Sequence, residues 1–199
     1  NAAENNLKRA DELKKQQQKQ LDNLKKQAEE ATRYKEISRE IKKVEAGLYY
    51  LKIKEIESMK IGDPQNEDTD IGSVISISHL EKVESYVELA LQEGGKILTG
   101  GNRPILDGSN ANGAFLSPTV ISGLDINSRT ATEEIFGPVV TLHTFKDEAE
   151  AVEMANNTDY GLAGSVWTKN SERGKEFSKL IETGIMWVNT WLHRDLRTP

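Results

Sequence analysis

The first quarter of the chain lacks the residues that interrupt helices. From Glu4 to Lys54 there is no proline and a single glycine, Gly47, while Lys, Glu, Gln, Ala and Leu predominate. These residue types are strong helix formers. The segment therefore predicts one long helix, and about 50 residues would extend on the order of 75 Å.

Apolar side chains recur along this segment in alternating steps of three and four residues. The stripe comprises Leu7, Ala10, Leu21, Leu24, Ala28, Ala31, Tyr34, Ile37, Ile41, Val44, Leu48 and Leu51. The spacing is a heptad pattern with a phase shift after Ala31, and Lys14 and Gln17 weaken its early part. A stripe this narrow predicts a coiled-coil partner helix. Glu and Asp are interleaved with the basic residues, which favours a solvated helix over a nucleic-acid-binding surface in this segment.

Composition changes abruptly after residue 54. The first 54 residues hold 14 Lys and Arg against 9 Asp and Glu, whereas the remainder holds 12 against 23. All five prolines and 14 of the 15 glycines lie in the remainder. We therefore predict two domains, a long coiled-coil-like helix over residues 1–56 and a second domain over residues 57–199.

Several function classes are excluded by what the sequence lacks. It contains no cysteine, so it has no disulfide, no thiolate metal site and no cysteine nucleophile. It has no apolar run of the roughly 20 residues that cross a bilayer, and its polar N-terminus lacks a secretory signal. We expect a cytoplasmic protein with no membrane partner. Because the chain begins with Asn1 rather than Met, we also expect it to be a fragment.

The second domain alternates helix and strand patterns. Helices are predicted at about residues 78–93, at 148–156 with Asp147 as the N-cap, and through Ile181 with Ser171 as the N-cap. Strands are predicted at 96–99, 115–121, 139–145, 162–168 and 185–189. This alternation predicts an α/β fold with a mostly parallel sheet and helices on its faces. The three histidines, His79, His143 and His193, are widely separated, and no metal site is predicted.

The second domain also carries an ordered series of motifs: Lys60-Ile61-Gly62-Asp63-Pro64, Glu93-Gly94-Gly95-Lys96, Glu133-Glu134-Ile135-Phe136-Gly137-Pro138, Asn156-Asn157-Thr158-Asp159-Tyr160-Gly161-Leu162 and Gly184-Ile185-Met186-Trp187-Val188-Asn189. In this order they resemble the C-terminal part of the catalytic domain of NAD(P)-dependent aldehyde dehydrogenases. The resemblance covers about residues 57–199. It implies a partial aldehyde dehydrogenase catalytic domain, an aldehyde substrate, and a parent enzyme that is a homo-oligomer.

The resemblance also implies a cofactor site. In the family, the second Glu of the E-E-I-F-G-P motif binds the nicotinamide ribose hydroxyls, and the Phe packs beside the nicotinamide ring. These roles fall on Glu134 and Phe136, with NAD as the expected cofactor and NADP as the alternative. A carboxylate suits the ribose because its two oxygens can accept from both hydroxyls.

The last residues indicate the kind of aldehyde. The segment from Asn189 to Pro199 resembles the subgroup that acts on 2-hydroxymuconic or 2-aminomuconic semialdehyde, and in the superfamily the loop after this Asn lines the aldehyde pocket. Arg194, and secondarily Arg197, would bind a substrate carboxylate through a guanidinium fork. Asn189 and Trp191 complete the expected substrate-binding set. The alternative is that the arginines pair with Asp195 or face solvent.

Family catalysis uses a cysteine thiolate, a general-base Glu and an oxyanion-stabilising Asn. By order along the chain, all three would precede Met59, where the helical segment stands. The 199 residues contain no cysteine. We therefore assign no catalytic residue and expect the chain to be inactive on its own.

Three stretches of the helical segment are also distinctive: residues 2–7, 27–36 (Gln-Ala-Glu-Glu-Ala-Thr-Arg-Tyr-Lys-Glu) and 41–51. Together they resemble the start of the coiled-coil arm of bacterial structural-maintenance-of-chromosomes ATPases. No G-x-x-x-x-G-K-[ST] occurs in the chain, so no ATPase activity is assigned. Three interpretations remain open. The chain is a chimera of the two families, a chromosome-maintenance fragment, or a non-catalytic coiled-coil scaffold fused to a degenerate cofactor-binding lobe.

Overall fold

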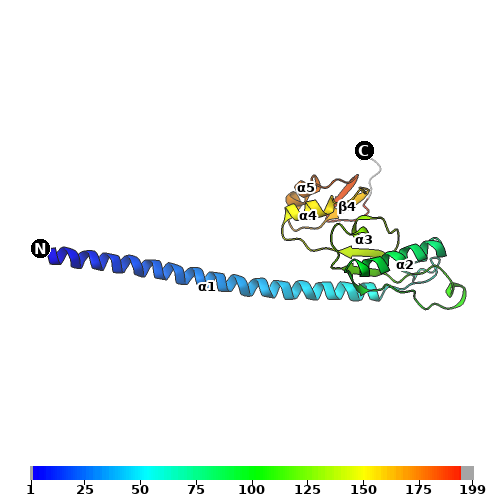
Figure 1. Ribbon diagram of the computed structural model, residues 1–199, viewed down its shortest axis with the longest axis horizontal. Helices are drawn as coiled ribbons and strands as arrows, with labels where there is room; N and C mark the ends of the chain where they lie inside the picture. The colour runs from blue at the N-terminus through cyan, green and yellow to red at the C-terminus, as the bar shows by residue number, and fades with distance from the viewer. Residues whose placement is uncertain (1, 194–199) are drawn as a thin grey trace. The chain divides into compact units, whose positions relative to one another are not determined.

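A single helix accounts for the N-terminal part of the chain. The structure, a computed structural model, describes residues 2–193. Helix α1 runs from Ala2 to Glu57 without interruption (Figure 1), as the absence of proline predicted. The contacts within the chain divide it into two units, which separate between Lys52 and Ile53. The domain boundary expected between residues 56 and 57 stays a prediction.

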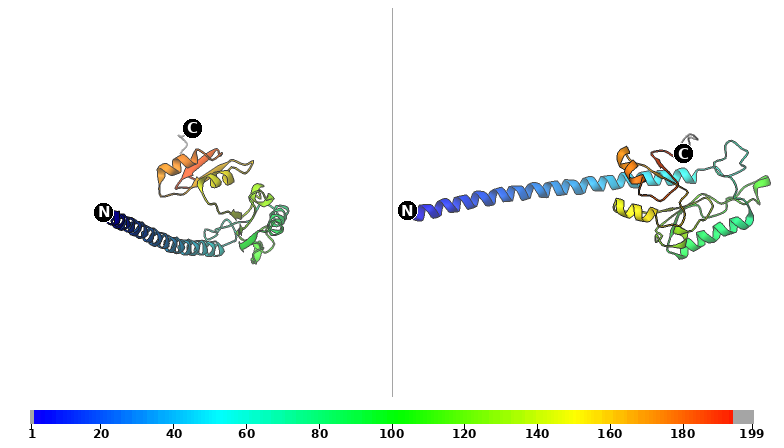
Figure 2. Two further views of the ribbon diagram at one scale, coloured as in Figure 1. Left: turned by 60° about the vertical axis from the view of Figure 1, so that its left-hand side comes forward. Right: turned by 90° about the horizontal axis from the view of Figure 1, so that it is seen from above.

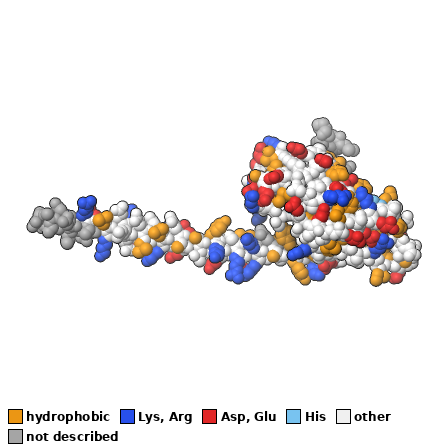
Figure 3. Space-filling model, in the orientation of Figure 1, with side chains coloured by type: hydrophobic (Ala, Val, Ile, Leu, Met, Phe, Trp, Pro, Cys, Tyr) orange, Lys and Arg blue, Asp and Glu red, His pale blue; other side chains and the backbone are white. Residues whose placement is uncertain are grey.

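The described side chains of the apolar stripe of α1, from Leu21 onward, face solvent. Its later members are each at least 50% exposed: Ile37, Ile41, Val44, Leu48 and Leu51. Hydrophobic side chains recur along the helix between charged ones in the space-filling view (Figure 3). A shallow groove lies between Ile37, Ile41 and Val44 and is bounded by Glu36 and Glu40. No described helix of the chain is long and apolar enough to span a membrane.

The second unit begins with a helix laid on a three-stranded sheet. Helix α2 (Ile77–Gln92) is followed by β1 (Lys96–Thr99), a short 3-10 turn (Gly108–Asn110), β2 (Thr119–Ser122), α3 (Arg129–Thr132) and β3 (Val139–Leu142). The strand order is β1-β2-β3. Strand β1 is antiparallel to β2, and β2 is parallel to β3. Figure 2 shows the same elements from two further sides.

The core of this unit lies between α2 and the sheet. One buried cluster joins Leu80 and Val83 of α2 to Ala114, Leu116 and Ile135. A second cluster joins Ala90 at the end of the same helix to Ile121 and Leu124. Burial of these side chains stabilises the unit. Since Ile135 lies between Glu134 and Phe136, the core also anchors the loop that carries the expected cofactor residues.

A second, smaller sheet follows. Helix α4 (Glu148–Ala155) precedes β4 (Ala163–Val166), and α5 (Ser171–Ser178) connects β4 to the parallel strand β5 (Ile185–Val188). Asn157 links this part to the loop before α3, because its Nδ2 donates to Ile126 O at 2.9 Å. The α/β fold class is therefore confirmed. Two of the three strand pairings are parallel, but they lie in two sheets rather than in the single sheet that was predicted.

The predicted boundaries were wrong in a few places. The strand expected at 115–121 begins only at Thr119, since Pro118 has no N–H to donate. The strand expected at 139–145 ends at Leu142. Helix α5 is capped by Asn170, whose side chain accepts from Arg173 N, and not by Ser171; it ends at Ser178 rather than Ile181. Asp147 caps α4 as predicted.

Candidate cofactor and substrate site

The residues after α3 lie along one side of α2. Glu93, at the C-terminal end of α2, accepts hydrogen bonds from the backbone N–H groups of Arg129 (2.9 Å) and Thr130 (3.1 Å) at the start of α3. Burial opposes ionisation of Glu93, but Thr130, through its side chain and its N–H group, and Arg129, through its N–H group and its charge, together hold the pKa of Glu93 below the ordinary value. The carboxylate therefore caps α3 and ties it to α2.

Glu133 is fully engaged by neighbouring side chains. Arg129 donates to both of its oxygens, Nε to Oε1 at 2.7 Å and Nη2 to Oε2 at 3.0 Å. The Tyr86 hydroxyl of α2 donates to Oε2 at 2.5 Å. The guanidinium and the phenol lower the pKa of Glu133 to about 2. Hydrogen bonding to Glu133 raises the pKa of Tyr86 in turn. Glu133 is thus a structural carboxylate.

Glu134 differs from its neighbour in having an unoccupied carboxylate. Its side chain is exposed, and within residues 2–193 no described side chain or backbone group bonds to it. Both oxygens are available to accept hydrogen bonds from a ligand. Of the two adjacent carboxylates, only Glu134 can take the role that the motif suggested.

Phe136 is held out from the core by its backbone. It has a φ of 58°, in the left-handed region that non-glycine residues seldom adopt, and its side chain is 71% exposed. The His79 ring of α2 donates from Nε2 to Phe136 O at 2.7 Å. The two rings meet edge to face with their centroids 6.0 Å apart. An aromatic face held in this way can stack against a planar ligand.

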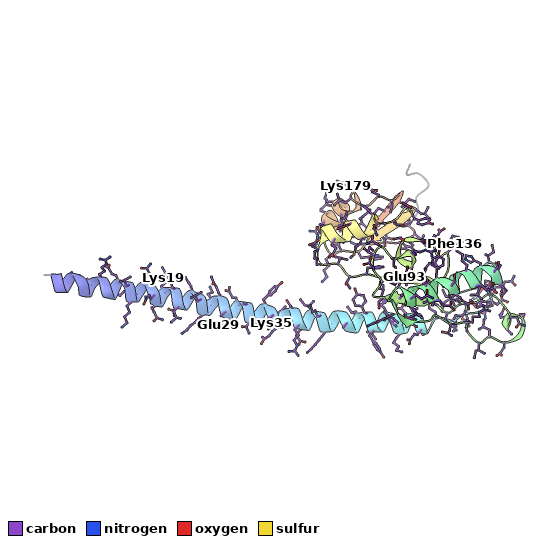
Figure 4. The ribbon with its side chains drawn as sticks, in the orientation of Figure 1. Lys19, Glu29, Lys35, Glu93, Phe136 and Lys179 are labelled. Atoms are coloured by element: carbon purple, nitrogen blue, oxygen red, sulfur yellow. The ribbon has the colours of Figure 1, made fainter. Side chains whose placement is uncertain are left out.

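Gly137 allows this loop to approach α2 closely. A Cβ on Gly137 would lie 2.8 Å from both Cγ atoms of Val83, which is fully buried. The sequence analysis did not anticipate this reason for the glycine. Figure 4 labels Glu93 and Phe136, which lie toward opposite ends of α2.

The expected substrate residues lie after β5. Asn189 has a φ of 56°, and its amide is occupied by the backbone of Thr168. Its Oδ1 accepts from Thr168 N at 2.7 Å, and its Nδ2 donates to Thr168 O at 2.8 Å. Asn189 therefore joins the ends of β4 and β5, while the second N–H of its amide is not used by these two bonds.

Two tryptophans accompany Asn189. Trp187 is 8% exposed and donates from Nε1 to His193 O at 2.7 Å. Its ring meets that of Trp191 edge to face at 5.1 Å, and Trp191 is 54% exposed. An exposed aromatic beside a strand end can contribute to a pocket wall. Arg194 and Arg197 lie outside the described residues.

Comparison with known proteins decides the family. Residues 42–199 match the aldehyde dehydrogenase family. The chain belongs to the aldehyde dehydrogenase family.

Individual relatives agree with this assignment. A 2-aminomuconic 6-semialdehyde dehydrogenase from a Pseudomonas species is 47% identical over 144 residues, which are 72% of this chain and 29% of that protein. A 2-hydroxymuconic semialdehyde dehydrogenase from Pseudomonas putida is 44% identical over 142 residues, 71% of this chain and 29% of that protein. The chain thus spans less than a third of the length of these relatives.

Solved structures place the chain in the same family. Betaine aldehyde dehydrogenase from Staphylococcus aureus, in complex with NAD+, superposes with a TM-score of 0.70 at 36% identity, over 76% of this chain and 30% of that one. An aldehyde dehydrogenase from Burkholderia cenocepacia gives a TM-score of 0.72 at 34% identity, over 77% and 31%.

The expected site residues of this aldehyde dehydrogenase segment fall into two places. Glu134 and Phe136 share one loop beside α2, while Asn189 and Trp191 follow β5. Among the described residues, no hydrogen bond, ion pair or ring contact joins the two pairs. Sequence reasoning gave His79 no role in a site, although it contacts Phe136. The seven-residue spacing from His79 to Tyr86 would have placed both on one face of α2.

Proposed function

We propose that this chain carries part of the catalytic domain of an NAD(P)-dependent aldehyde dehydrogenase that oxidises a semialdehyde bearing a carboxylate. The contrast between the adjacent carboxylates supports the proposal most directly: Glu133 is bound on both oxygens, whereas Glu134 is exposed and has no bonded partner in the described part of the chain. A fold that satisfies one carboxylate and leaves the next one open suits a ligand at Glu134.

The described residues fit a nicotinamide nucleotide. Glu134 offers two acceptors for a pair of ribose hydroxyls, and Phe136 offers an exposed ring two residues away. NAD supplies a hydride acceptor when bound, and NADP is the alternative. The chain's own residues bind and orient: Glu134 would hold the ribose, Phe136 would flank the ring, and His79 would hold the Phe136 carbonyl.

The proposed substrate class rests on the segment after β5. Arg194 and, secondarily, Arg197 would pair with the carboxylate of a semialdehyde through their guanidinium forks. Trp191 would line the pocket, and Asn189 would shape the loop through its bonds to Thr168. The names of the relatives, which include two muconic semialdehyde dehydrogenases, support this substrate class.

The dehydrogenation itself needs groups beyond these 199 residues. The chain has no cysteine to form a covalent bond to the aldehyde. We therefore expect no NADH formation when the purified chain is mixed with NAD and 2-hydroxymuconic semialdehyde. NADH formation at 340 nm above a blank without protein would contradict this expectation.

Binding tests the cofactor role separately. NADH should perturb the amide resonances of residues 134–137 in the full chain, and Glu134→Gln should weaken its affinity about tenfold, the usual effect of removing a charged acceptor. Glu88→Gln is the matched control, since Glu88 is also exposed on the same unit and has no bonded partner among the described residues. Equal affinity of both variants and the wild type would refute the assignment.

The N-terminal helix supports a second role. Its exposed stripe suits a partner helix, as in the arm of a structural-maintenance-of-chromosomes protein or a coiled-coil scaffold. The aldehyde dehydrogenase match begins at residue 42, within α1, so the family assignment and this coiled-coil resemblance overlap over residues 42–54. Long reads of the source DNA across codons 54–59 would distinguish a natural fusion from a chimera.

A further inference from the structure

Three polar side chains of α2 lie seven residues apart. His79 is in its first turn, Tyr86 in its middle, and Glu93 at its C-terminal end. Seven residues are almost two helical turns, so the three form one row along the helix, about 21 Å from first to last. The rest of that face contributes buried apolar residues to the core.

Each member of this row bonds to a different point of residues 129–136. Glu93 accepts from the N–H groups of Arg129 and Thr130. Tyr86 donates to Glu133, and His79 donates to Phe136 O. The contacts therefore run in opposite directions along the two segments, from the end of α2 to its beginning as residues 129–136 proceed.

We propose that His79, Tyr86 and Glu93 are positioning residues that hold residues 129–136 in register on α2. The proposal deepens the cofactor role of Glu134 and Phe136 and rests on it for its functional consequence. Glu134 lies between the Tyr86 and His79 contacts, so its backbone is restrained on both sides, while its carboxylate bonds to none of the described residues.

Core packing alone does not account for this arrangement. Ile135 enters the core beside Leu80 and Val83, but one apolar side chain leaves the segment free to pivot about it. Three hydrogen-bonded contacts spread over about 21 Å remove that freedom. Two of them also involve ionised carboxylates, which form stronger hydrogen bonds than neutral groups do.

Amide hydrogen exchange of the full chain tests the register directly. Glu93→Gln keeps the shape of the side chain but replaces one acceptor oxygen with a donor. The Arg129 or Thr130 amide should then exchange on the order of tenfold faster, as expected when a hydrogen bond to a charged group is lost. Amides of Val120 and Ile121 in β2 should be unchanged, and Glu88→Gln should alter neither set.

Tyr86→Phe provides a second, nearly isosteric variant. It should accelerate exchange of the Glu133 amide, which bonds to Arg129 O at 2.8 Å, again without changing β2. Unchanged exchange at residues 129–133 in both variants would overturn the proposal. Equal acceleration in β2 would also overturn it, because the contacts would then contribute only to overall stability.

NADH affinity separates this proposal from the cofactor assignment. If the wild-type chain binds NADH, Glu93→Gln and Tyr86→Phe should each weaken binding several-fold, and Glu88→Gln should not. Faster amide exchange at residues 129–133 with unaltered affinity for NADH would refute the positioning role. If the wild-type chain binds no NADH, the cofactor assignment fails, and the exchange data alone decide whether α2 sets the register.

Discussion

Gly137 is the position where one added methyl group should disturb the candidate site most. A Cβ there would lie 2.8 Å from Val83 Cγ1 and Cγ2, far inside the ordinary carbon–carbon contact of about 3.5–4.0 Å. Val83 is 0% exposed, so it has no space to retreat. Gly137→Ala must therefore push the loop away from α2. Such overpacking costs typically 1–3 kcal/mol.

A second substitution identifies the contact responsible. Val83→Ala deletes both clashing methyl groups and, alone, should cost about 2 kcal/mol through lost burial and a residual cavity. In the double variant, the new methyl of Ala at position 137 partly fills that space. The double variant should then be more stable than the sum of the single effects predicts, by about 1–2 kcal/mol.

Hydrogen exchange of the Val120 and Ile121 amides in β2 measures these changes in the stability of the second unit. The signal contains no contribution from unfolding of helix α1. A loss of about 2 kcal/mol corresponds to roughly thirtyfold faster exchange when the amides open globally. Gly72→Ala is the control, because a Cβ there meets its nearest atom at 3.5 Å. Additive effects of the two substitutions would refute the argument, as would a Gly137→Ala chain as stable as the control.

Two further predictions concern Glu133 and Asn189. The pKa of Glu133 is lowered to about 2 from 4.5, so the stability it contributes is fully present above about pH 4.5 and is lost as the pH falls toward 2. An acid titration of exchange rates should show a smaller loss of stability for Glu133→Gln than for the wild type. Equal losses of stability would contradict the contacts of Glu133 with Arg129 and Tyr86. Asn189→Ala should destabilise the β4–β5 pair by about 2 kcal/mol, because two bonds to Thr168 disappear and alanine disfavours the φ of 56°. Asn189→Gly should cost less because glycine accepts that φ. Denaturation followed by tryptophan fluorescence checks the order of the two variants, and equal costs would exclude backbone strain.

Local sequence signals predicted the helices better than the strands. Helix α2 begins at Ile77 because Ser76 caps it and ends before Gly94, which has a φ of 88°. Gly95 N bonds to Ala90 O, as in a helix end closed by a glycine. These features lie within a few residues of the ends they set, and the predicted range of about 78–93 differed from the observed one by one residue at each end, although Ser76 was not identified as the cap. Strand ends depend on a neighbouring strand: Pro118 gave a local reason for β2 to start at Thr119, but its end at Ser122 is set by pairing with β1 and β3.

The division into two sheets had no local signal. Parallel pairing of β2 with β3 and of β4 with β5 is fixed by contacts between segments some 20 residues apart. The alternation of helix and strand predicted the parallel pairs but not which pairs share a sheet. The left-handed backbone conformation of Asn189 could not be predicted from the sequence either. It accompanies bonds to the backbone of Thr168, which lies 21 residues earlier.

The candidate cofactor residues illustrate the same limit at the level of single side chains. The motif placed Glu134 and Phe136, but it gave no physical reason why the second carboxylate rather than the first should face a ligand. Part of that reason was readable, because Arg129 precedes Glu133 by four residues, the spacing at which charged side chains pair on a helix. Because Arg129 bonds to Glu133, that carboxylate is not available to a ligand, whereas Glu134 has no bonded partner among the described residues. The other part, the hydroxyl of Tyr86, comes from 47 residues away. That contact could be identified only in the folded structure. Substitution of Tyr86 therefore tests why the two carboxylates differ.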